Sequence, residues 1–370
     1  MVQIRQRFRH RQRDLLIGVC GVLMAAWPSP ARKFYADDPL WREPPAIAVK
    51  KVAKRDINEQ YEFFLNTFHE PGKKERQEGT VPRAGNVNTM DEVPDSAWFT
   101  NRYGSPESIP HQKMTREDLV RGPGDSMRPS TNEPWTVLSG KNGGVTPGLV
   151  IRDSEGKKFV LKFDPLSSPE MASAVDVIGS KFFYALGFNV PENHIVYFTR
   201  SQLRLTPQSR FKNFYGHERE MTERDLTDQL AKTPRDREGR YRAMASFFIP
   251  GDILGPFRFT GTRADDPNDI VRHENRRELR GLYAMAAWLN HTDIKSGNTL
   301  DSLVNEAGGR FIRHYLVDFG AIMGSASVSA KEAADGQLYM FDLKPAAVQF
   351  LTLGLYLRHW DVYRFPDLPG

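Results

Sequence analysis

Cysteine is almost absent from this chain of 370 residues, which contains only Cys20. Cys20 lies in an apolar run near the amino terminus, so removal of that segment leaves no cysteine at all. A disulfide framework and a cysteine-ligated metal are then excluded, and stability must come from packing. The chain also lacks a His-Glu-x-x-His zinc motif and a Gly-x-Ser-x-Gly nucleophile elbow.

Long apolar runs are lacking as well. The apolar run near the amino terminus covers residues 15–27, which is shorter than the roughly 20 residues of a spanning helix. A basic stretch precedes it, and the small residues Ser29 and Ala31 follow, which is the layout of a secretory signal. We therefore expect residues 1–31 to be an export signal or a short membrane anchor. The protein is expected to be exported, whether periplasmic, secreted or anchored, and to meet a membrane only through this segment.

Basic residues exceed acidic residues by five, but this excess belongs to the leader. The first 31 residues contain five arginines and one acid, and the rest of the chain holds 46 basic and 45 acidic residues. A nearly neutral body gives no reason to expect a nucleic-acid partner. The hydrophobic fraction of 39% is ordinary for a globular protein with a buried core.

Residues 32–130 are rich in proline, glycine and charge, and they predict an irregular extension. A short helix is expected over residues 57–68, where apolar residues recur at helical spacing. Residues 93–99 place Trp98 and Phe99 after a turn. This segment is either a lid or a structural strap that packs on the neighbouring domain, and we favour the strap.

The chain from residue 135 alternates strand and helix signals. Apolar runs bounded by turns predict strands over residues 135–138, 149–152 and 158–163. A helix is expected next, capped by Ser168, with Pro169 at its first position and Gly187 at its end. Its predicted apolar face consists of Val175, Ile178, Phe182 and Leu186.

Further elements are expected beyond this helix. Residues 189–198 and 245–250 predict two more strands, and the charged residues 200–240 between them predict an exposed insertion. A second helix is expected over residues 276–289, with Leu279, Leu282, Tyr283 and Ala286 on one face.

Two short motifs after that helix carry the chemistry. The first runs from His291 to Asn298, and the second is Asp318-Phe319-Gly320 at the end of an apolar strand. Mg²⁺ prefers oxygen ligands and takes only one or two from a protein when phosphates complete its shell. Asn298 and Asp318 are suited to supply them. Asp293 is placed to accept the proton of a hydroxyl group, and Lys295 is placed to neutralise charge on a transferred phosphate.

The spacing His-x-Asp-x-Lys-x-x-Asn followed by Asp-Phe-Gly resembles the catalytic loop and the magnesium motif of protein kinases. The resemblance covers about residues 135–330. It implies an α+β, two-lobed fold, with an antiparallel sheet and one helix in an N-lobe over residues 135–250. A reduced helical C-lobe is implied over residues 251–370. The implied cofactors are ATP and Mg²⁺, with Mn²⁺ as an alternative metal.

The end of the chain departs from typical protein kinases. Only 50 residues follow Gly320, and they contain no Ala-Pro-Glu motif. The chain therefore looks more similar to compact atypical kinases of the HipA type and the spore-coat type. The loop-like composition of residues 364–370 leaves a truncated chain as an alternative. Acceptor recognition in the family depends on this region, so the acceptor cannot be predicted.

The resemblance also implies nucleotide-binding residues upstream. Lys162 resembles the strand-three lysine of the family, and its partner carboxylate on the following helix is either Asp176 or Glu170. We favour Asp176, because an acid in the first helical turn is already explained by the helix dipole. The loop from Gly140 to Gly148 contains Gly140, Gly143 and Gly144. It is either a phosphate lid or a flexible hairpin.

These residues predict a magnesium-dependent phosphotransferase that moves the γ-phosphate of ATP to a hydroxyl group of a protein or small molecule. Two alternatives stay open. One is an exported pseudokinase or nucleotide-binding scaffold, which export favours because ATP is scarce outside the cytoplasm. The other is a nucleotidyltransferase with a kinase fold.

Overall fold

The computed structural model describes residues 45–58, 60–62, 64, 78–87, 92–102, 114–132, 134–141, 148–212, 217–332, 335 and 343–357. All of them belong to one unit, Trp41–Gly370. The predicted export signal, Gly143, Gly144 and residues 364–370 lie outside the described residues. Within the described ranges, no helix has the length and apolar character needed to cross a bilayer.

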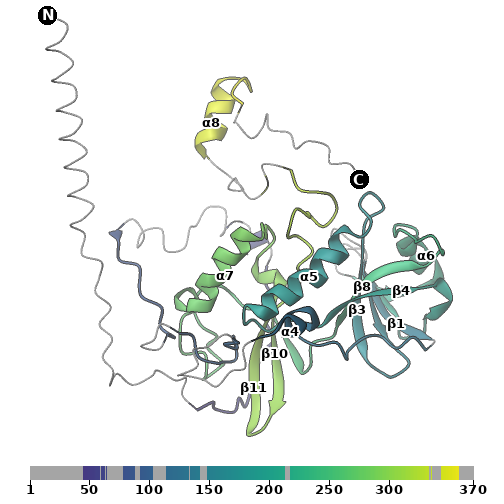
Figure 1. Ribbon diagram of the computed structural model, residues 1–370, viewed down its shortest axis with the longest axis horizontal. Coiled ribbons are helices and arrows are strands. Elements are labelled where there is room, and N and C mark those ends of the chain that lie inside the picture. Colours follow the sequence, from purple (N-terminus) through teal and green to yellow (C-terminus); the bar gives the residue numbers. More distant parts are fainter. Residues whose placement is uncertain are drawn as a thin grey trace, which may run out of the picture. The chain divides into compact units, whose positions relative to one another are not determined.

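An eight-stranded mixed sheet dominates the α+β fold (Figure 1). Its order is β4-β8-β3-β2-β1-β6-β7, and β5 also pairs with β1. The bounds are β1 (Trp135–Lys141), β2 (Gly148–Arg152), β3 (Lys158–Phe163), β4 (Asn193–Phe198), β5 (Leu203–Arg204), β6 (Arg210–Lys212), β7 (Glu218–Glu220) and β8 (Tyr241–Phe247). Neighbours are antiparallel, except that β1 runs parallel to β5 and β6. The prediction of an antiparallel sheet therefore holds for the five strands β4, β8, β3, β2 and β1. It missed the parallel pairing of β1 with β5 and β6.

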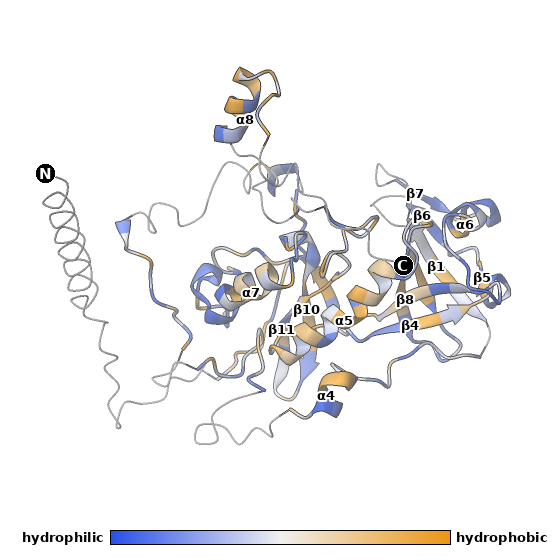
Figure 2. Ribbon diagram, turned by 45° about the horizontal axis from the view of Figure 1, so that its top comes forward, coloured by the Kyte–Doolittle hydropathy of each residue, from blue (hydrophilic) through white to orange (hydrophobic). Residues whose placement is uncertain are grey.

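One face of this sheet forms an apolar core. In β3, Phe159, Leu161 and Phe163 are fully buried, while Val160 and Lys162 alternate toward the other face. The period of two is the ordinary geometry of a strand. Apolar stretches of β1, β4 and β8 complete the core and stand out in Figure 2. The same alternation that buries the core therefore presents Lys162 to the opposite face.

The prediction of an exposed insertion over residues 200–240 is wrong in part. This segment contains β5, β6, β7 and α6 (Glu223–Leu230), and it extends the sheet beyond β1. Its buried side chains belong to the main core and include Phe211, Met221, Leu226 and Leu230. The high density of charged residues suggested an exposed segment, but each short strand needs only a few buried residues to join the core. In β6, only Phe211 is buried between Arg210 and Lys212.

The helix after β3 is present as α5 (Met171–Ala185), but two details of the prediction are wrong. The helix begins two residues after Pro169, and Glu170 is its N-cap with φ of 67°. Its buried side includes Ala172, Asp176, Gly179 and Phe183, while Ile178 is exposed. A polar residue occupies the buried stripe because it has an ionic partner there.

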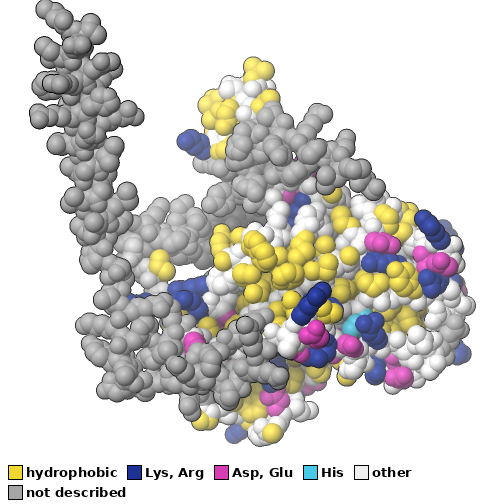
Figure 3. Space-filling model, in the orientation of Figure 1, with side chains coloured by type: hydrophobic (Ala, Val, Ile, Leu, Met, Phe, Trp, Pro, Cys, Tyr) yellow, Lys and Arg dark blue, Asp and Glu magenta, His cyan; other side chains and the backbone are white. Residues whose placement is uncertain are grey.

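A three-stranded antiparallel sheet follows, ordered β11-β10-β9. Its strands are β9 (Asp252–Gly255), β10 (Thr299–Glu306) and β11 (Gly309–Leu316). Besides α5 and α6, the described residues form the helices α4 (Arg116–Arg121), α7 (Arg277–Trp288) and α8 (Leu343–Leu351). The helix predicted over residues 276–289 is confirmed by α7, but Tyr283 on its predicted apolar face is 79% exposed. Apolar side chains gather on the face that carries α5 and α7 (Figure 3), and the exposed ones include Ile178, Tyr283 and Trp288.

The amino-terminal extension packs against the part of the chain that follows β8. Asn268 Nδ2 donates to the backbone oxygen of Ile47, and Arg263 donates to that of Ala53. Further along, the Asn86 amide donates to Glu278 at the start of α7. These long-range bonds join segments separated by about 200 positions. The extension is therefore joined to residues 263–278 by hydrogen bonds at several points.

Trp98 anchors the segment that we interpreted as a strap. Its side chain is 4% exposed, stacks on His314 with ring centroids 3.6 Å apart, and lies below the Arg276 guanidinium at 4.9 Å. It also contacts Phe257 edge to face. Burial on this scale fits a structural strap.

Loss of Trp98 is expected to destabilise the protein strongly. Replacement of a buried Trp by Ala typically costs about 3–5 kcal/mol, because transfer and cavity terms add. Trp288 is 66% exposed and provides the matched control, for which Trp288→Ala should cost less than about 1 kcal/mol. Urea unfolding of both variants measures the difference. Equal effects would contradict the strap assignment.

Candidate active site

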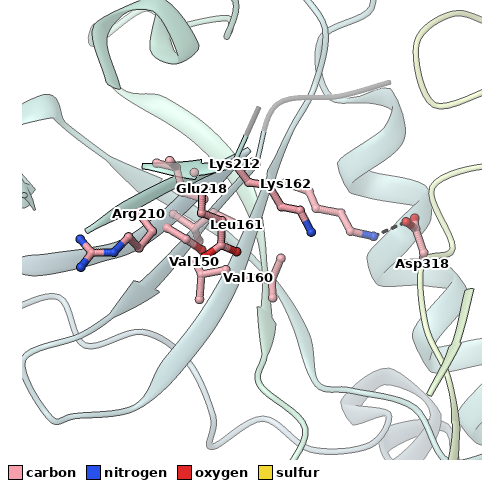
Figure 4. Close-up of a pocket in the computed structure, with 12 residues that line it drawn as sticks. Val150, Val160, Leu161, Lys162, Arg210, Lys212, Glu218 and Asp318 are labelled. Atoms are coloured by element: carbon pink, nitrogen blue, oxygen red, sulfur yellow. Dashed lines mark ion pairs between the residues drawn. The ribbon is translucent and has the colours of Figure 1, made fainter. Parts of the chain in front are cut away.

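Lys162 on β3 joins two carboxylates that lie far apart in the sequence. Its Nζ lies 3.0 Å from Asp176 Oδ2 on α5 and 2.7 Å from Asp318 Oδ1, which follows β11. Figure 4 shows the pair with Asp318. The ion pair expected between Lys162 and Asp176 is therefore present. Glu170, the alternative partner, is an exposed N-cap residue.

Asp176 is held by three groups, and its side chain is only 2% exposed. Besides Lys162, its Oδ1 accepts hydrogen bonds from Asn193 Nδ2 at 2.9 Å and from the backbone N–H of Phe319 at 3.3 Å. A buried carboxylate needs such partners. Asn193 and the Phe319 amide were not predicted. No local pattern marks them, because β4 and the Asp318 turn meet α5 only in the folded chain.

Charge is unevenly balanced at this centre, with one lysine between two carboxylates. Burial alone would lower the pKa of Lys162, but Asp176 and Asp318 outweigh it and raise that pKa above its ordinary value. Burial raises the pKa of Asp176, and the Lys162 charge offsets only part of this effect. The nearby Asp318 charge adds to the rise. We conclude that Lys162 stays charged, and that a cation placed near the two carboxylates would relieve their repulsion.

Asp318 sits in an unusual backbone conformation. Its φ is 65°, in the left-handed region that Asp and Asn tolerate better than most residues. The preceding Val317 N–H donates to the backbone oxygen of Asn298 at 3.0 Å, and the following Phe319 stacks on Phe183. These neighbours fix the turn, so the Asp318 carboxylate reaches Lys162 while its side chain remains 43% exposed.

The residues predicted as the catalytic loop form one connected group. Asn298 Nδ2 donates to the backbone oxygen of Asp293 at 2.7 Å and to its Oδ2 at 2.9 Å. Lys295 Nζ lies 3.0 Å from Asp293 Oδ1. A 3₁₀ turn, Ser296–Asn298, leads directly into β10. The Val317–Asn298 backbone bond connects this loop to the segment after β11 that contains Asp318.

His291, at the start of this loop, is a buried packing residue. It is 7% exposed, and its ring packs against Phe183 and Phe319. Burial lowers its pKa to about 4, against the opposing effect of Asp293. The folded protein therefore keeps His291 neutral through the range in which an unfolded histidine takes up a proton.

This burial predicts acid sensitivity. An unfolded histidine titrates near 6.5, so the stabilisation is complete above pH 6.5 and is lost as the pH falls toward 4. The two values differ enough for a loss of about 3 kcal/mol. Urea unfolding of the wild type between pH 7 and pH 4 measures it, and His291→Phe should flatten the curve by that amount. An equally steep curve in the variant would contradict the assignment.

A pocket of about 220 Å³ lies beside Lys162 and Asp318. Strands β1, β2, β3, β6 and β7 line it, and Figure 4 shows its side chains. Gly140 and Gly148 belong to the lining, whereas Gly143 and Gly144 lie outside the described residues. Gly140 has a packing reason as well: a Cβ there would lie 2.8 Å from Met221 Cε and Gln229 Oε1.

The donors at this centre fit a hard divalent cation. Asn298 donates from Nδ2 to Asp293 and has an amide oxygen left as a possible ligand, and Asp318 has a carboxylate, both of which are ligand types that Mg²⁺ prefers. Among the described residues, no group of three or more His, Cys, Asp or Glu side chains could hold a metal alone. Mg²⁺ does not require one when phosphates and water complete its shell.

Comparison with known proteins gives no family for this chain. No family model, curated protein or solved structure matches it.

Proposed function

We propose that this protein is a kinase-like phosphotransferase that moves the γ-phosphate of ATP to a hydroxyl group of a protein or small molecule. The observation that carries the proposal is the convergence of Lys162, Asp176 and Asp318 beside a pocket on the open face of the sheet. The three residues come from β3, α5 and the turn after β11. An ordinary surface ion pair does not need a buried carboxylate held by two further donors.

The named residues then have separate tasks. Lys162, held by Asp176, contacts the nucleotide phosphates as a fixed charge. Asn298 and Asp318 would hold Mg²⁺, which when bound neutralises charge on the phosphates. Asp293 accepts the proton of the acceptor hydroxyl as that oxygen bonds to the γ-phosphorus and the bond from phosphorus to ADP breaks. Lys295, which pairs with Asp293, would neutralise the charge that develops on the transferred group.

The direct test is intact-mass spectrometry after incubation with Mg²⁺ and ATP. Added phosphate on the protein or on a supplied acceptor, absent from Asp318→Asn, supports the proposal. Added nucleotide instead would favour the nucleotidyltransferase. Neither product, with nucleotide still bound, would favour the exported scaffold.

A further inference from the structure

Lys212 lies in the same row of the sheet as Lys162. The strand registers pair Lys162 with Gly148, Gly148 with Lys141, and Lys141 with Lys212 on β6. Adjacent strands lie about 4.8 Å apart, so three steps separate the two backbones by about 14 Å. The insertion therefore places a lysine across the sheet from Lys162.

Lys212 faces the pocket. Strand alternation buries Phe211 in the core and directs its neighbours to the opposite face. Lys212 lines the pocket together with Lys162 and Asp318, and in Figure 4 its amino group points toward the Lys162 side. The two lysines thus border one cavity from different strands.

The two lysines differ in their partners. Lys162 is engaged by two carboxylates. The Lys212 amino group forms no hydrogen bond or ion pair with any part of the chain that the structure describes. Arg210 also lines the pocket, but its guanidinium donates to the backbone oxygens of Pro207 and Ser209. Glu218 is opposite Lys212 in register and shares the lining, so the position is not purely basic.

We infer that Lys212 is a second phosphate-binding residue of this pocket. The inference rests on the proposed function in taking the pocket as a nucleotide site. An ammonium group on a flexible stem is suited to a phosphate oxygen. At this separation the two lysines can contact different phosphates of one nucleotide, or a nucleotide phosphate and a phosphate of the acceptor. The shared chemistry is a phosphate group, and the experiment separates the two sources.

The test is calorimetric titration of the full chain with tripolyphosphate, ATP and AMP at fixed ionic strength. Lys212→Ala should weaken tripolyphosphate binding about tenfold, the scale of one charged hydrogen bond. Lys212→Arg should retain most of the affinity. Glu218→Gln should strengthen binding a few-fold, because a repelling charge is removed. Lys232, exposed on the same insertion, supplies the control Lys232→Ala, which should match the wild type.

The nucleotide series identifies the source. If Lys212→Ala weakens ATP but not AMP, the phosphate belongs to the nucleotide tail. If ATP binding is unchanged, and inorganic phosphate binds the ATP-saturated wild type but not the variant, it belongs to a second ligand. Affinities within twofold of the wild type for every anion would overturn the inference.

Failure of the proposed function gives a different pattern. A wild type that binds tripolyphosphate through Lys212 but does not bind ATP would remove the nucleotide site and keep the phosphate site. ATP binding that depends on Lys162, together with Lys212→Ala affinities that match the wild type for every anion, would keep the nucleotide site and remove the phosphate site at Lys212. A wild type that binds none of these anions would overturn both.

Discussion

Asp318→Asn should lower the rate of phosphoryl transfer by about a thousandfold, the upper range for loss of one charge-stabilising group. The substitution keeps the shape of the side chain but removes the charge that holds Mg²⁺ and attracts Lys162. The fold should survive, because the side chain is 43% exposed and Asn tolerates a φ of 65°. A transfer assay at saturating Mg²⁺ measures the loss.

Two controls make this result specific. Thermal unfolding should shift by only a few degrees, since Lys162 keeps Asp176 as its partner. Asp252→Asn removes another exposed carboxylate, one that pairs with Arg310 away from the pocket, and should leave the rate unchanged. Full activity in folded Asp318→Asn would remove the metal assignment.

Asp293→Ala should abolish transfer and leave nucleotide affinity within about twofold. A positioned general base typically contributes between about a hundredfold and ten-thousandfold to the rate. Asp293 is expected to contact the acceptor hydroxyl, so its loss should act on kcat more than on binding. Calorimetry with nucleotide and a transfer assay on the same preparations separate the two quantities.

The conservative variant Asp293→Asn tests whether Asp293 acts as a general base or only positions the loop. Its amide oxygen can still accept the hydrogen bond from Asn298 Nδ2, but it cannot take up a proton at neutral pH. Both variants should therefore be inactive. Activity retained only in Asp293→Asn would show that the residue positions the loop. Equal losses of binding and rate in Asp293→Ala would assign Asp293 to the nucleotide, and no change in either would favour the scaffold.

Local sequence patterns predicted where strands and helices occur better than they predicted which side chains of each helix are buried. Strand β3 has the predicted bounds because Phe159, Leu161 and Phe163 alternate with polar or smaller residues. The ion pair of Lys162 with Asp176 was also predictable, since a carboxylate inside an apolar helix needs a partner. The predicted apolar face of α5 is correct only in part, because Val175, Phe182 and Leu186 pack against the core whereas Ile178 is 42% exposed.

The unpredicted features depend on contacts between distant segments. Asn193 reaches Asp176 from β4, and Trp98 stacks on His314 across more than 200 positions. The insertion joins the core through single buried residues such as Phe211, each flanked by charge. Charge density predicts exposure on average, but it cannot show which strand edge a segment will cover.

A crystal structure with Mn²⁺ and a non-hydrolysable ATP analogue tests the proposed metal and nucleotide site most directly. Anomalous scattering locates Mn²⁺ without reference to activity. We predict a Mn²⁺ peak between Asn298 Oδ1 and the Asp318 carboxylate, with the analogue's phosphates against Lys162. Phosphates bound away from Lys162, or Mn²⁺ bound only at other carboxylates, would contradict the account.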